Sequence, residues 1–317
     1  MIMTRAVGYD DPKVLQKLDE ISDRASKEYS NERAIRKMYA DWEPTEFAVK
    51  EYKGTFILDG EAVENNQALL DDHLIKTQGM KGSPFAQVFI EEITKWENQL
   101  LTTQENLDQW VRVQAVWLYL EPVFSSEDIL KQMPVEGNIF RQVDNSWKQL
   151  MQQIYENTRA LDVMKLEGLG KILIEAHKKL EEVQKGLNNY LEGKRGLFPR
   201  FCFLSDGELL EILSETKEPL KVQPHLKKCF EGIAALEFDD EKKIHGMYSS
   251  EDEYVPFVTE IDPNASKGNV EDWLCKVEDV MLRSVKDIIE KSLKDYTNKE
   301  RDKWITTWQG QAVLCVS

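Results

Sequence analysis

The chain has little positive charge for its length of 317 residues. It contains 41 Lys and Arg against 57 Asp and Glu, which gives a formal net charge of −16. A surface of this sign is repelled by nucleic acids and anionic membranes. We therefore expect neither nucleic acid nor membrane among its direct partners. The plainest explanation of the charge is solubility.

The sequence is also poor in cysteine, with only four, and no two of them have Cys-x2-Cys metal spacing. We expect buried free thiols in a reducing compartment. No apolar run approaches the roughly 18 residues of a membrane-spanning helix, and the amino terminus lacks the apolar segment of a signal peptide. The cysteines are Cys202, Cys229, Cys275 and Cys315.

Motifs for catalysis are missing as well. A nucleotide-binding P-loop requires Gly-x4-Gly-Lys-Ser/Thr. Its nearest counterpart, at Gly193-Lys194, has Asn188 at the first glycine position and Arg195 at the hydroxyl position. The four histidines are far apart, and no His-Glu-x-x-His or Gly-x-Ser-x-Gly occurs. We predict no catalytic, cofactor-binding or metal-binding residues, and no enzymatic activity in this chain by itself.

The longest stretch without glycine or proline, from Phe85 to Glu121, predicts one long helix. Ser83-Pro84 before it is typical of a helix start, and Pro122 after it of a helix end. Such a helix would be about 55 Å long. A compact globule of this chain length would be only about 50 Å across. An apolar stripe with 4-3 spacing follows the segment: Phe89, Ile93, Trp96, Leu100, Leu107, Trp110 and Trp117, interrupted by Thr103 and Gln114.

Other segments complete a mainly α prediction. Helices are predicted within 11–42 and 62–76, after Ser125, from Phe140 onward, and from Leu169 to Gly193 or Gly196. Tyr52–Gly60 and Phe201–Leu204 resemble strands, Ser205-x-x-Glu208 is a capping box, and three short strands between 233 and 258 predict an antiparallel meander. Gly268-Asn269 precedes a last long helix, and Trp304 and Trp308 form a final helical turn.

The predicted fold class is therefore mainly α, an elongated multi-helix rod or bundle with a small antiparallel β meander in the carboxyl-terminal third. Three segments are expected. Residues 1–60 hold amino-terminal helices and a strand piece, 61–196 a bundle of long helices, and 197–317 an α+β part.

Four tryptophans are candidate docking or packing residues. Trp110 and Trp117 lie in the long stripe, where core packing is the favoured interpretation, although interfaces also favour tryptophan. Trp304 and Trp308, near the carboxyl end, are expected to pack against something beyond the chain.

Two longer segments resemble the linker of dynein heavy chains. One is Trp110–Ile129, which includes Trp-Leu-Tyr-Leu-Glu-Pro-Val-Phe. The other begins with Phe-Pro-Arg-Phe-Cys-Phe-Leu-Ser at Phe198–Ser205 and continues through Glu208–Leu213 to Val222–Ile233. Segments around Trp273 and at Trp308–Leu314 extend the resemblance, which is greatest to axonemal heavy chains of the inner-arm type. Cys202 replaces a usual aromatic residue, and Asp206-Gly207 replaces a usual Asn-Asp.

The resemblance implies a mechanical role. Dynein motors have a ring of six ATPase modules, a microtubule-binding stalk, and a linker that bends and straightens across the ring to drive movement toward the minus end. This chain would be the carboxyl-terminal two-thirds of the linker. ATP and Mg would then belong to the ring of the parent chain, and this segment would need no cofactor. The implied partners are that ring, microtubules through the distant stalk, and other dynein subunits. The implied location is the axoneme of a cilium or flagellum, within the cytoplasm and cytoskeleton.

A lever must be stiff along most of its length and compliant at one place. The candidate hinge residues are Gly168, Gly170, Gly196 and Pro199, with the loop from Pro122 to Pro134 as a third possibility. An ordinary inter-helix loop is the simpler interpretation of each. The alternative function is a helical scaffold or interaction module without a motor role, although the chain lacks the repeats typical of spectrin-like scaffolds. An independent ATPase is a third interpretation, and we expect no ATP hydrolysis.

Overall fold

The structure is a computed structural model that describes residues 12–214, 216 and 218–316. It is 73% helical, with two small antiparallel sheets, as the predicted mainly α class requires. By its internal packing the chain divides into two units. Unit 1 comprises Met1–Leu118 and Phe140–Glu181, and unit 2 comprises Tyr119–Ile139 and Glu182–Ser317. The three predicted segments remain a prediction.

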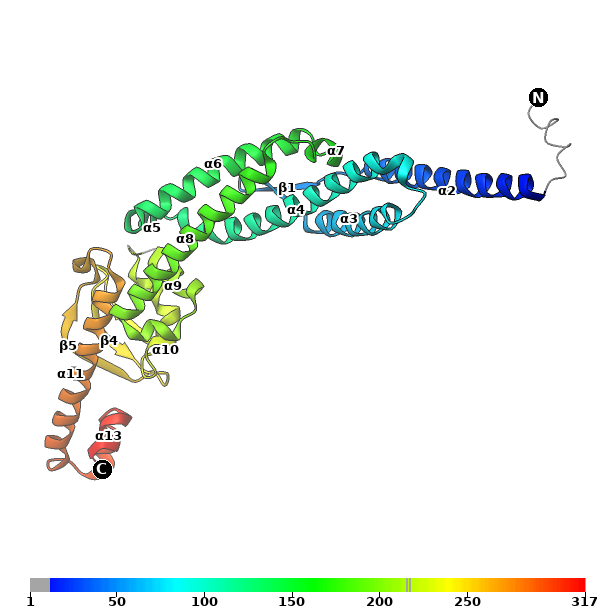
Figure 1. The fold of residues 1–317 in the computed structure, drawn as a ribbon. Helices are drawn as coiled ribbons and strands as arrows, with labels where there is room; N and C mark the ends of the chain where they lie inside the picture. Colours follow the sequence, from blue (N-terminus) through cyan, green and yellow to red (C-terminus); the bar gives the residue numbers. More distant parts are fainter. Residues whose placement is uncertain (1–11, 215, 217, 317) are drawn as a thin grey trace. The chain divides into compact units, whose positions relative to one another are not determined.

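Unit 1 is helical apart from one hairpin (Figure 1). Its elements, in chain order, are α2 (Pro12–Trp42), β1 (Val49–Tyr52), β2 (Thr55–Leu58), α3 (Gly60–Lys81), η1 (Gln87–Phe89), α4 (Ile90–Phe124) as far as Leu118, α6 (Pro134–Glu156) from Phe140, α7 (Ala160–Val163) and α8 (Leu169–Leu197) as far as Glu181. The predicted helix within 11–42 is a single helix.

Tryptophans fill the core of unit 1. Trp96, Trp110 and Trp117 of the α4 stripe are each at most 1% exposed, which confirms the predicted apolar face. Trp110 lies against Phe47 with ring centroids 5.8 Å apart, and Trp117 stacks on Trp147 at 5.7 Å. Large aromatic side chains bury the most apolar area per residue, so these contacts contribute much of the stability of the unit.

Helix α4 differs from its prediction at both ends. Ser83 does not start the helix; it belongs to a turn in which Ala86 N–H donates to the Ser83 carbonyl at 3.1 Å, and η1 precedes Ile90. At the other end Pro122 lies inside the helix, which ends at Phe124. Proline removes its own hydrogen bond to the preceding turn, but the two residues after it retain their N–H groups and complete the helix.

The segment predicted as one strand, Tyr52–Gly60, instead holds the last residue of β1, the hairpin turn, β2 and the first residue of α3. Tyr52 pairs with Thr55 across a turn at Lys53 and Gly54, whose φ angles are 45° and 78°. Two successive left-handed residues are typical of the tight turns that match strand twist. Asp59 then caps α3, because its side chain accepts a hydrogen bond from Glu61 N–H.

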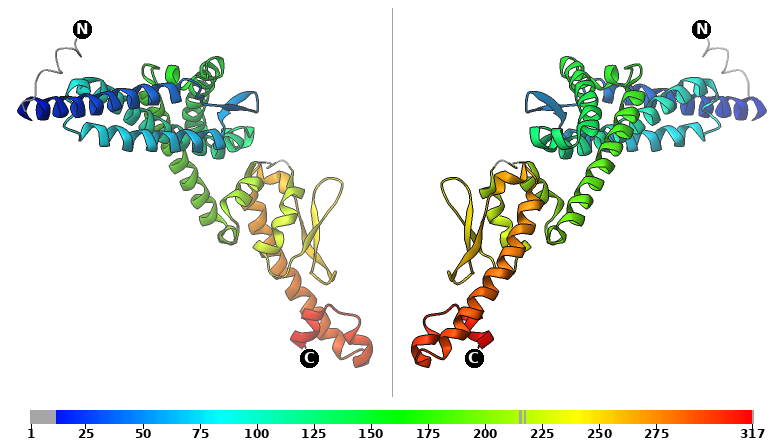
Figure 2. Two further views of the ribbon diagram at one scale, coloured as in Figure 1. Left: turned by 90° about the vertical axis from the view of Figure 1, so that its right-hand side faces the viewer. Right: turned by 90° about the vertical axis from the view of Figure 1, so that its left-hand side faces the viewer.

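Unit 2 joins short helices to a three-stranded sheet and one long helix (Figure 2). Beyond the shared helices it contains α5 (Glu127–Gln132), η2 (Pro199–Phe203), α9 (Asp206–Ser214), η3 (Pro219–His225), α10 (Leu226–Cys229), β3 (Ala235–Phe238), β4 (Ile244–Tyr248), β5 (Tyr254–Ile261), η4 (Pro263–Ser266), α11 (Val270–Tyr296), α12 (Arg301–Ile305) and α13 (Gly310–Val316). The sheet order β3-β4-β5 is antiparallel, so the predicted meander is confirmed.

Helix α8 runs from Leu169 to Leu197, so the helix predicted from Leu169 to Gly193 or Gly196 is confirmed, and buried Leu191 continues its apolar stripe. The strand predicted just after it is wrong. Phe201–Leu204 is not a strand; most of it forms the 3₁₀ helix η2, which begins at Pro199. Proline fixes φ near the helical value and suits the first position of a helix.

Helix α11 buries one face against the sheet, with Trp273, Val277, Val280, Ser284 and Ile288 all buried. The expectation that Trp304 packs against something beyond the chain is wrong, because its side chain is fully buried, whereas Trp308 is half-buried and the expectation for it stays a prediction. Trp304 is fully buried and donates from Nε1 to the Ser292 carbonyl at 2.9 Å, and Trp308 Nε1 donates to Asp295 Oδ2 at 2.9 Å. Both tryptophans thus fold back onto α11.

All four cysteines are free, as predicted, but only Cys229 is buried; Cys202, Cys275 and Cys315 are exposed. Within the described residues, no helix is long and apolar enough to cross a membrane. Among the residues that the structure describes, no three or more His, Cys, Asp or Glu side chains are grouped so that they could hold a metal ion.

Candidate hinge segments and their bracing

The first candidate hinge, Gly168 and Gly170, lies in unit 1 between α7 and α8. Gly168 has φ of 82° and sits at the turn before α8. Only glycine adopts this left-handed conformation without steric cost. Gly170 is already inside α8, and a Cβ there would lie 2.5 Å from Asn106 Oδ1 of α4. The two glycines therefore serve a sharp turn and a close helix contact.

The second candidate hinge, Gly196 and Pro199, lies in unit 2 where α8 gives way to η2. Phe198 separates the two helices and is fully buried, with its ring 4.9 Å from that of Phe201 and 5.9 Å from that of Phe230. Gly196 has open space on its Cβ side, because nothing lies within 4 Å of that position. At this break Phe198 is held by aromatic packing, whereas the space beside Gly196 is empty.

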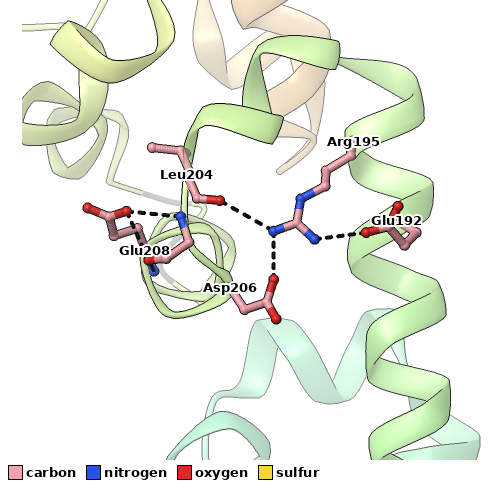
Figure 3. Close-up of polar contacts among 6 residues, drawn as sticks. Glu192, Arg195, Leu204, Asp206 and Glu208 are labelled. Carbon is pink, nitrogen blue, oxygen red and sulfur yellow. Dashed lines mark hydrogen bonds and ion pairs between the residues drawn. The ribbon is translucent and has the colours of Figure 1, made fainter.

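Arg195 braces the second break with polar contacts (Figure 3). Its Nη2 donates to Asp206 Oδ1 at 2.6 Å and to the Leu204 carbonyl at 3.4 Å, and its Nη1 donates to Glu192 Oε1 at 3.0 Å. The hydrogen bond to Asp206 is the main reason that the pKa of Arg195 is raised. One guanidinium thus joins the end of α8 to the start of α9.

The capping box predicted at the start of α9 is present. Ser205 N–H donates to Glu208 Oε2 at 3.0 Å, and Glu208 N–H donates to Ser205 Oγ at 3.4 Å. A hydrogen bond from Lys228, followed by those from Ser205, lowers the pKa of Glu208 to about 2. The similar pattern at Ser125–Asp128 does not form a box, because Ser126 makes no side-chain cap bond and its Oγ donates to the Ser214 carbonyl at 2.9 Å.

Two further ion pairs tie this break to α11. Lys194 Nζ lies 2.5 Å from Glu271 Oε1, and the two side chains are only 10% and 4% exposed. Arg200 Nε donates to Glu278 Oε1 at 2.9 Å, and its Nη1 donates to the Cys229 carbonyl at 3.1 Å. Within the described residues, Oε2 of Glu271 has no hydrogen-bond partner. A buried charge pair with one unsatisfied oxygen costs desolvation energy, so its strength depends on exact geometry.

The candidate docking tryptophans are all committed to their own unit. Trp110 and Trp117 are buried in unit 1, where Trp117 Nε1 donates to Asp144 Oδ1 at 3.1 Å. Trp304 and Trp308 pack on α11 in unit 2. Trp110, Trp117 and Trp304 are buried and offer no aromatic face to a partner, whereas Trp308 is half-buried.

The bracing residues were not identified from the sequence. In the sequence, Lys194 and Arg195 stand out only because they follow Gly193 in an incomplete P-loop pattern. Basic residues in the last turn of a helix are common and predict no particular partner. Glu271 is 77 positions from Lys194 in the chain, so no local spacing links the two.

Comparison with known proteins identifies the family. A family model described as dynein heavy chain, N-terminal region 2, matches residues 7–292. The chain belongs to the dynein heavy chain family. It is 52% identical over 315 residues to mouse (Mus musculus) dynein axonemal heavy chain 3, covering 99% of this chain and 8% of the relative. It is also 50% identical over 303 residues to dynein axonemal heavy chain 12 of Rattus norvegicus, covering 96% of this chain and 10% of the relative.

A third axonemal relative is more distant. Dynein axonemal heavy chain 1 of Homo sapiens is 45% identical over 300 residues, which are 95% of this chain and 7% of the relative. The chain thus spans a tenth or less of the length of these dynein heavy chains. The resemblance found in the sequence to axonemal dynein heavy chains is confirmed.

Proposed function

We propose that this chain is a mechanical element of an axonemal dynein heavy chain, a lever that transmits force produced elsewhere in the longer polypeptide. Membership of the dynein heavy chain family is the observation that carries the proposal. ATP and Mg would be bound by a ring of ATPase modules outside this segment, and microtubules by a distant stalk. The partners are that ring and other dynein subunits, and the location is the axoneme of a cilium or flagellum.

The internal architecture supports such a role. Helices α4, α8 and α11 contain 35, 29 and 27 residues, and continuous helices resist bending over their length. At 1.5 Å per residue α4 alone extends about 52 Å. The sequence has no P-loop motif. This agrees with a segment that moves during the nucleotide cycle of the heavy chain without binding nucleotide itself.

The two glycine-containing breaks differ in the contacts that bending would have to separate. At Gly168–Gly170 the chain is closely packed against Asn106, so bending there must separate α8 from α4. At Gly196–Pro199 bending must break the Arg195 contacts with Asp206 and Leu204. We favour the second break, because Gly196 has open space at its Cβ position and the two Arg195 hydrogen bonds that cross the break are exposed or partly exposed, although bending there would also open the buried pair of Lys194 and Glu271.

A disulfide across the first break tests the assignment in the full-length heavy chain. An ideal Cβ on residue 170 would lie 3.6 Å from Asn106 Cγ, so the two positions are neighbours, and Asn106→Cys/Gly170→Cys is the pair chosen for cross-linking. Microtubule gliding and ATP turnover are measured with the pair oxidised and reduced, and Asn106→Cys alone is the control. Bending at the second break predicts unchanged velocity in both states. Loss of velocity only on oxidation moves the hinge to Gly168–Gly170.

The lever itself is tested by nucleotide turnover. The isolated chain is expected to hydrolyse no ATP above background, whereas the full-length heavy chain hydrolyses it. ATP hydrolysis by the purified chain that survives removal of contaminating ATPases contradicts a purely mechanical role. Concentration-dependent self-association in sedimentation would instead favour the scaffold alternative.

A further inference from the structure

A groove in unit 2, here called the C-terminal groove, runs along α11 between the sheet and α13. Figure 2 shows β5 and α13 both lying along this helix, and both are in contact with it. The groove has a volume of about 990 Å³. Its floor includes Met247 and Val255, which are paired across β4 and β5 and therefore share one face of the sheet.

Helix α11 carries a second apolar row besides the face it buries. Met281, Val285 and Ile289 are spaced four residues apart and wall the groove. Leu282 beside them is 62% exposed, and Leu314 of α13 is 76% exposed. Residues four apart form one row on a helix. An exposed row of this kind, facing an apolar sheet surface, marks an interaction site more often than a random surface does.

The rim of the groove is acidic. Four carboxylates line it, those of Glu231, Glu251, Glu253 and Glu290, against one basic residue, Lys286. In the part of the chain that the structure describes, Glu231, Glu251 and Glu290 form no ion pair. Unpaired carboxylates around an apolar floor attract a partner with apolar residues on one face and positive charge beside them.

We propose that the C-terminal groove is a docking site for an amphipathic helix that carries Lys or Arg on its polar face. Apolar residues spaced three and four apart on that helix would enter between α11 and the sheet, and its basic residues would meet the acidic rim. Met247 and Met281 suit this role, because methionine side chains adapt their shape to a partner. The open, solvent-facing position of Leu282 fits a helix better than a small molecule, which is usually enclosed.

Two synthetic peptides test the charge complementarity. Each is about five helical turns long with leucines three and four residues apart, and the remaining positions are Lys-rich in one and Glu-rich in the other. Fluorescence anisotropy with the chain Met1–Ser317 should show the Lys-rich peptide binding at least about tenfold more tightly at low salt, with the preference shrinking as salt rises. Equal affinities overturn the proposal.

Two variants test the location. Leu282→Glu should weaken binding of the Lys-rich peptide about tenfold or more. Leu220→Glu changes a leucine of η3 that is 47% exposed and does not line the groove, and it should leave binding unchanged. Circular dichroism checks that both variants remain folded. Equal loss in the two variants means that the peptide does not bind in the groove.

Other occupants give different results. Self-association of the chain in sedimentation that Leu282→Glu abolishes would assign the groove to a second copy. A longer heavy-chain segment, extended past Ser317, that no longer binds the peptide would assign the groove to the same polypeptide. Either result overturns the proposal of a separate basic helix.

Discussion

The side-chain amide of Gln114 in α4 hydrogen-bonds both backbone groups of Leu58 at the end of β2. Nε2 of Gln114 donates to the Leu58 carbonyl at 3.2 Å, and Oε1 accepts from the Leu58 N–H at 2.7 Å. Gln114 is one of the two polar interruptions in the apolar stripe of α4. The interruption has a structural cause, because Leu58 is only 2% exposed and its backbone would otherwise be buried without partners.

Unit 2 repeats this device with a different glutamine. Gln223 Nε2 donates to the Leu236 carbonyl at 2.7 Å, and Gln223 Oε1 accepts from the Leu236 N–H at 3.0 Å. Leu236 lies in the edge strand β3. In each unit a glutamine side chain therefore satisfies backbone N–H and C=O groups of a short strand. Left unpaired at a sheet edge, such groups could pair with a strand of another chain.

Replacing Gln114 by leucine should reduce stability. The variant leaves two backbone groups of Leu58 unpaired, and we expect a loss of about 1–3 kcal/mol in the free energy of unfolding. Urea denaturation followed by circular dichroism measures it. Gln104→Leu is the matched control on the same helix, since the Gln104 bond to Asp71 is exposed, and it should change stability by at most about 0.5 kcal/mol. Equal effects of the two substitutions would show that the Leu58 bonds contribute nothing.

His73 should make unit 1 less stable in mild acid. It is 1% exposed, its Nδ1 accepts a hydrogen bond from Trp42 Nε1 at 2.9 Å, and its Nε2 lies 3.5 Å from Asp41 Oδ2. Burial lowers the pKa of His73, and the nearby Asp72 and Asp41 offset this only partly. The unfolded chain therefore binds the proton more readily, so stability falls as the pH drops below the ordinary histidine pKa of about 6.5.

The variant His73→Gln isolates this effect. A glutamine can still accept from Trp42 but does not titrate. We expect the stability difference between the original chain and the variant to shrink or reverse in favour of the variant between about pH 7 and pH 5. Urea unfolding at several pH values measures the difference, and the other three histidines cancel in it. A difference that is constant with pH would contradict a lowered pKa at His73.

The elements that sequence reasoning predicted well are those whose apolar residues recur at helical or strand spacing. The α8 stripe from Leu169 to Leu187 is buried as its spacing predicts, and so are Val277 and Ile288 of α11. Phe201–Leu204 was misassigned because a short apolar run has no distinguishable period. The deciding factor was Pro199, whose position at the start of η2 depends on where α8 ends.

The braces around the second break could not be predicted, because they join residues far apart in the chain. The spacing between Lys194 and Glu271, or between Arg200 and Glu278, carries no local signal. The packing of Trp304 against α11 could not be predicted either, because it depends on the turn between α11 and α12 that brings Trp304 back to Ser292. Sequence patterns fix which face of an element is apolar, whereas tertiary contacts fix what that face meets.

Stiffening the end of α8 should stabilise it. Neither Gly193 nor Gly196 has an atom within 4 Å of the Cβ position, and both lie inside the helix. Gly193→Ala and Gly196→Ala should each add about 0.5–1 kcal/mol, measured by urea unfolding and by slower amide exchange near residue 196. Gly168→Ala is the contrasting variant; with φ of 82° it should lose about 1 kcal/mol. If bending occurs at this end of α8, Gly196→Ala should also slow microtubule gliding by the full-length heavy chain.

The buried pair of Lys194 and Glu271 should behave as a coupled unit. Lys194→Met leaves a buried carboxylate without its cation, and we expect a loss of about 3–5 kcal/mol. Glu271→Gln keeps the shape and a hydrogen-bonding side chain, while the double variant removes both charges and should lose less than the sum of the single changes. Urea unfolding of all four chains gives the coupling energy. Because Lys194 also lies 5.4 Å from the centre of the Tyr190 ring, Met is chosen to retain that packing. Additive losses would show that the two charges contribute independently, and the brace between α8 and α11 would then rest on packing alone.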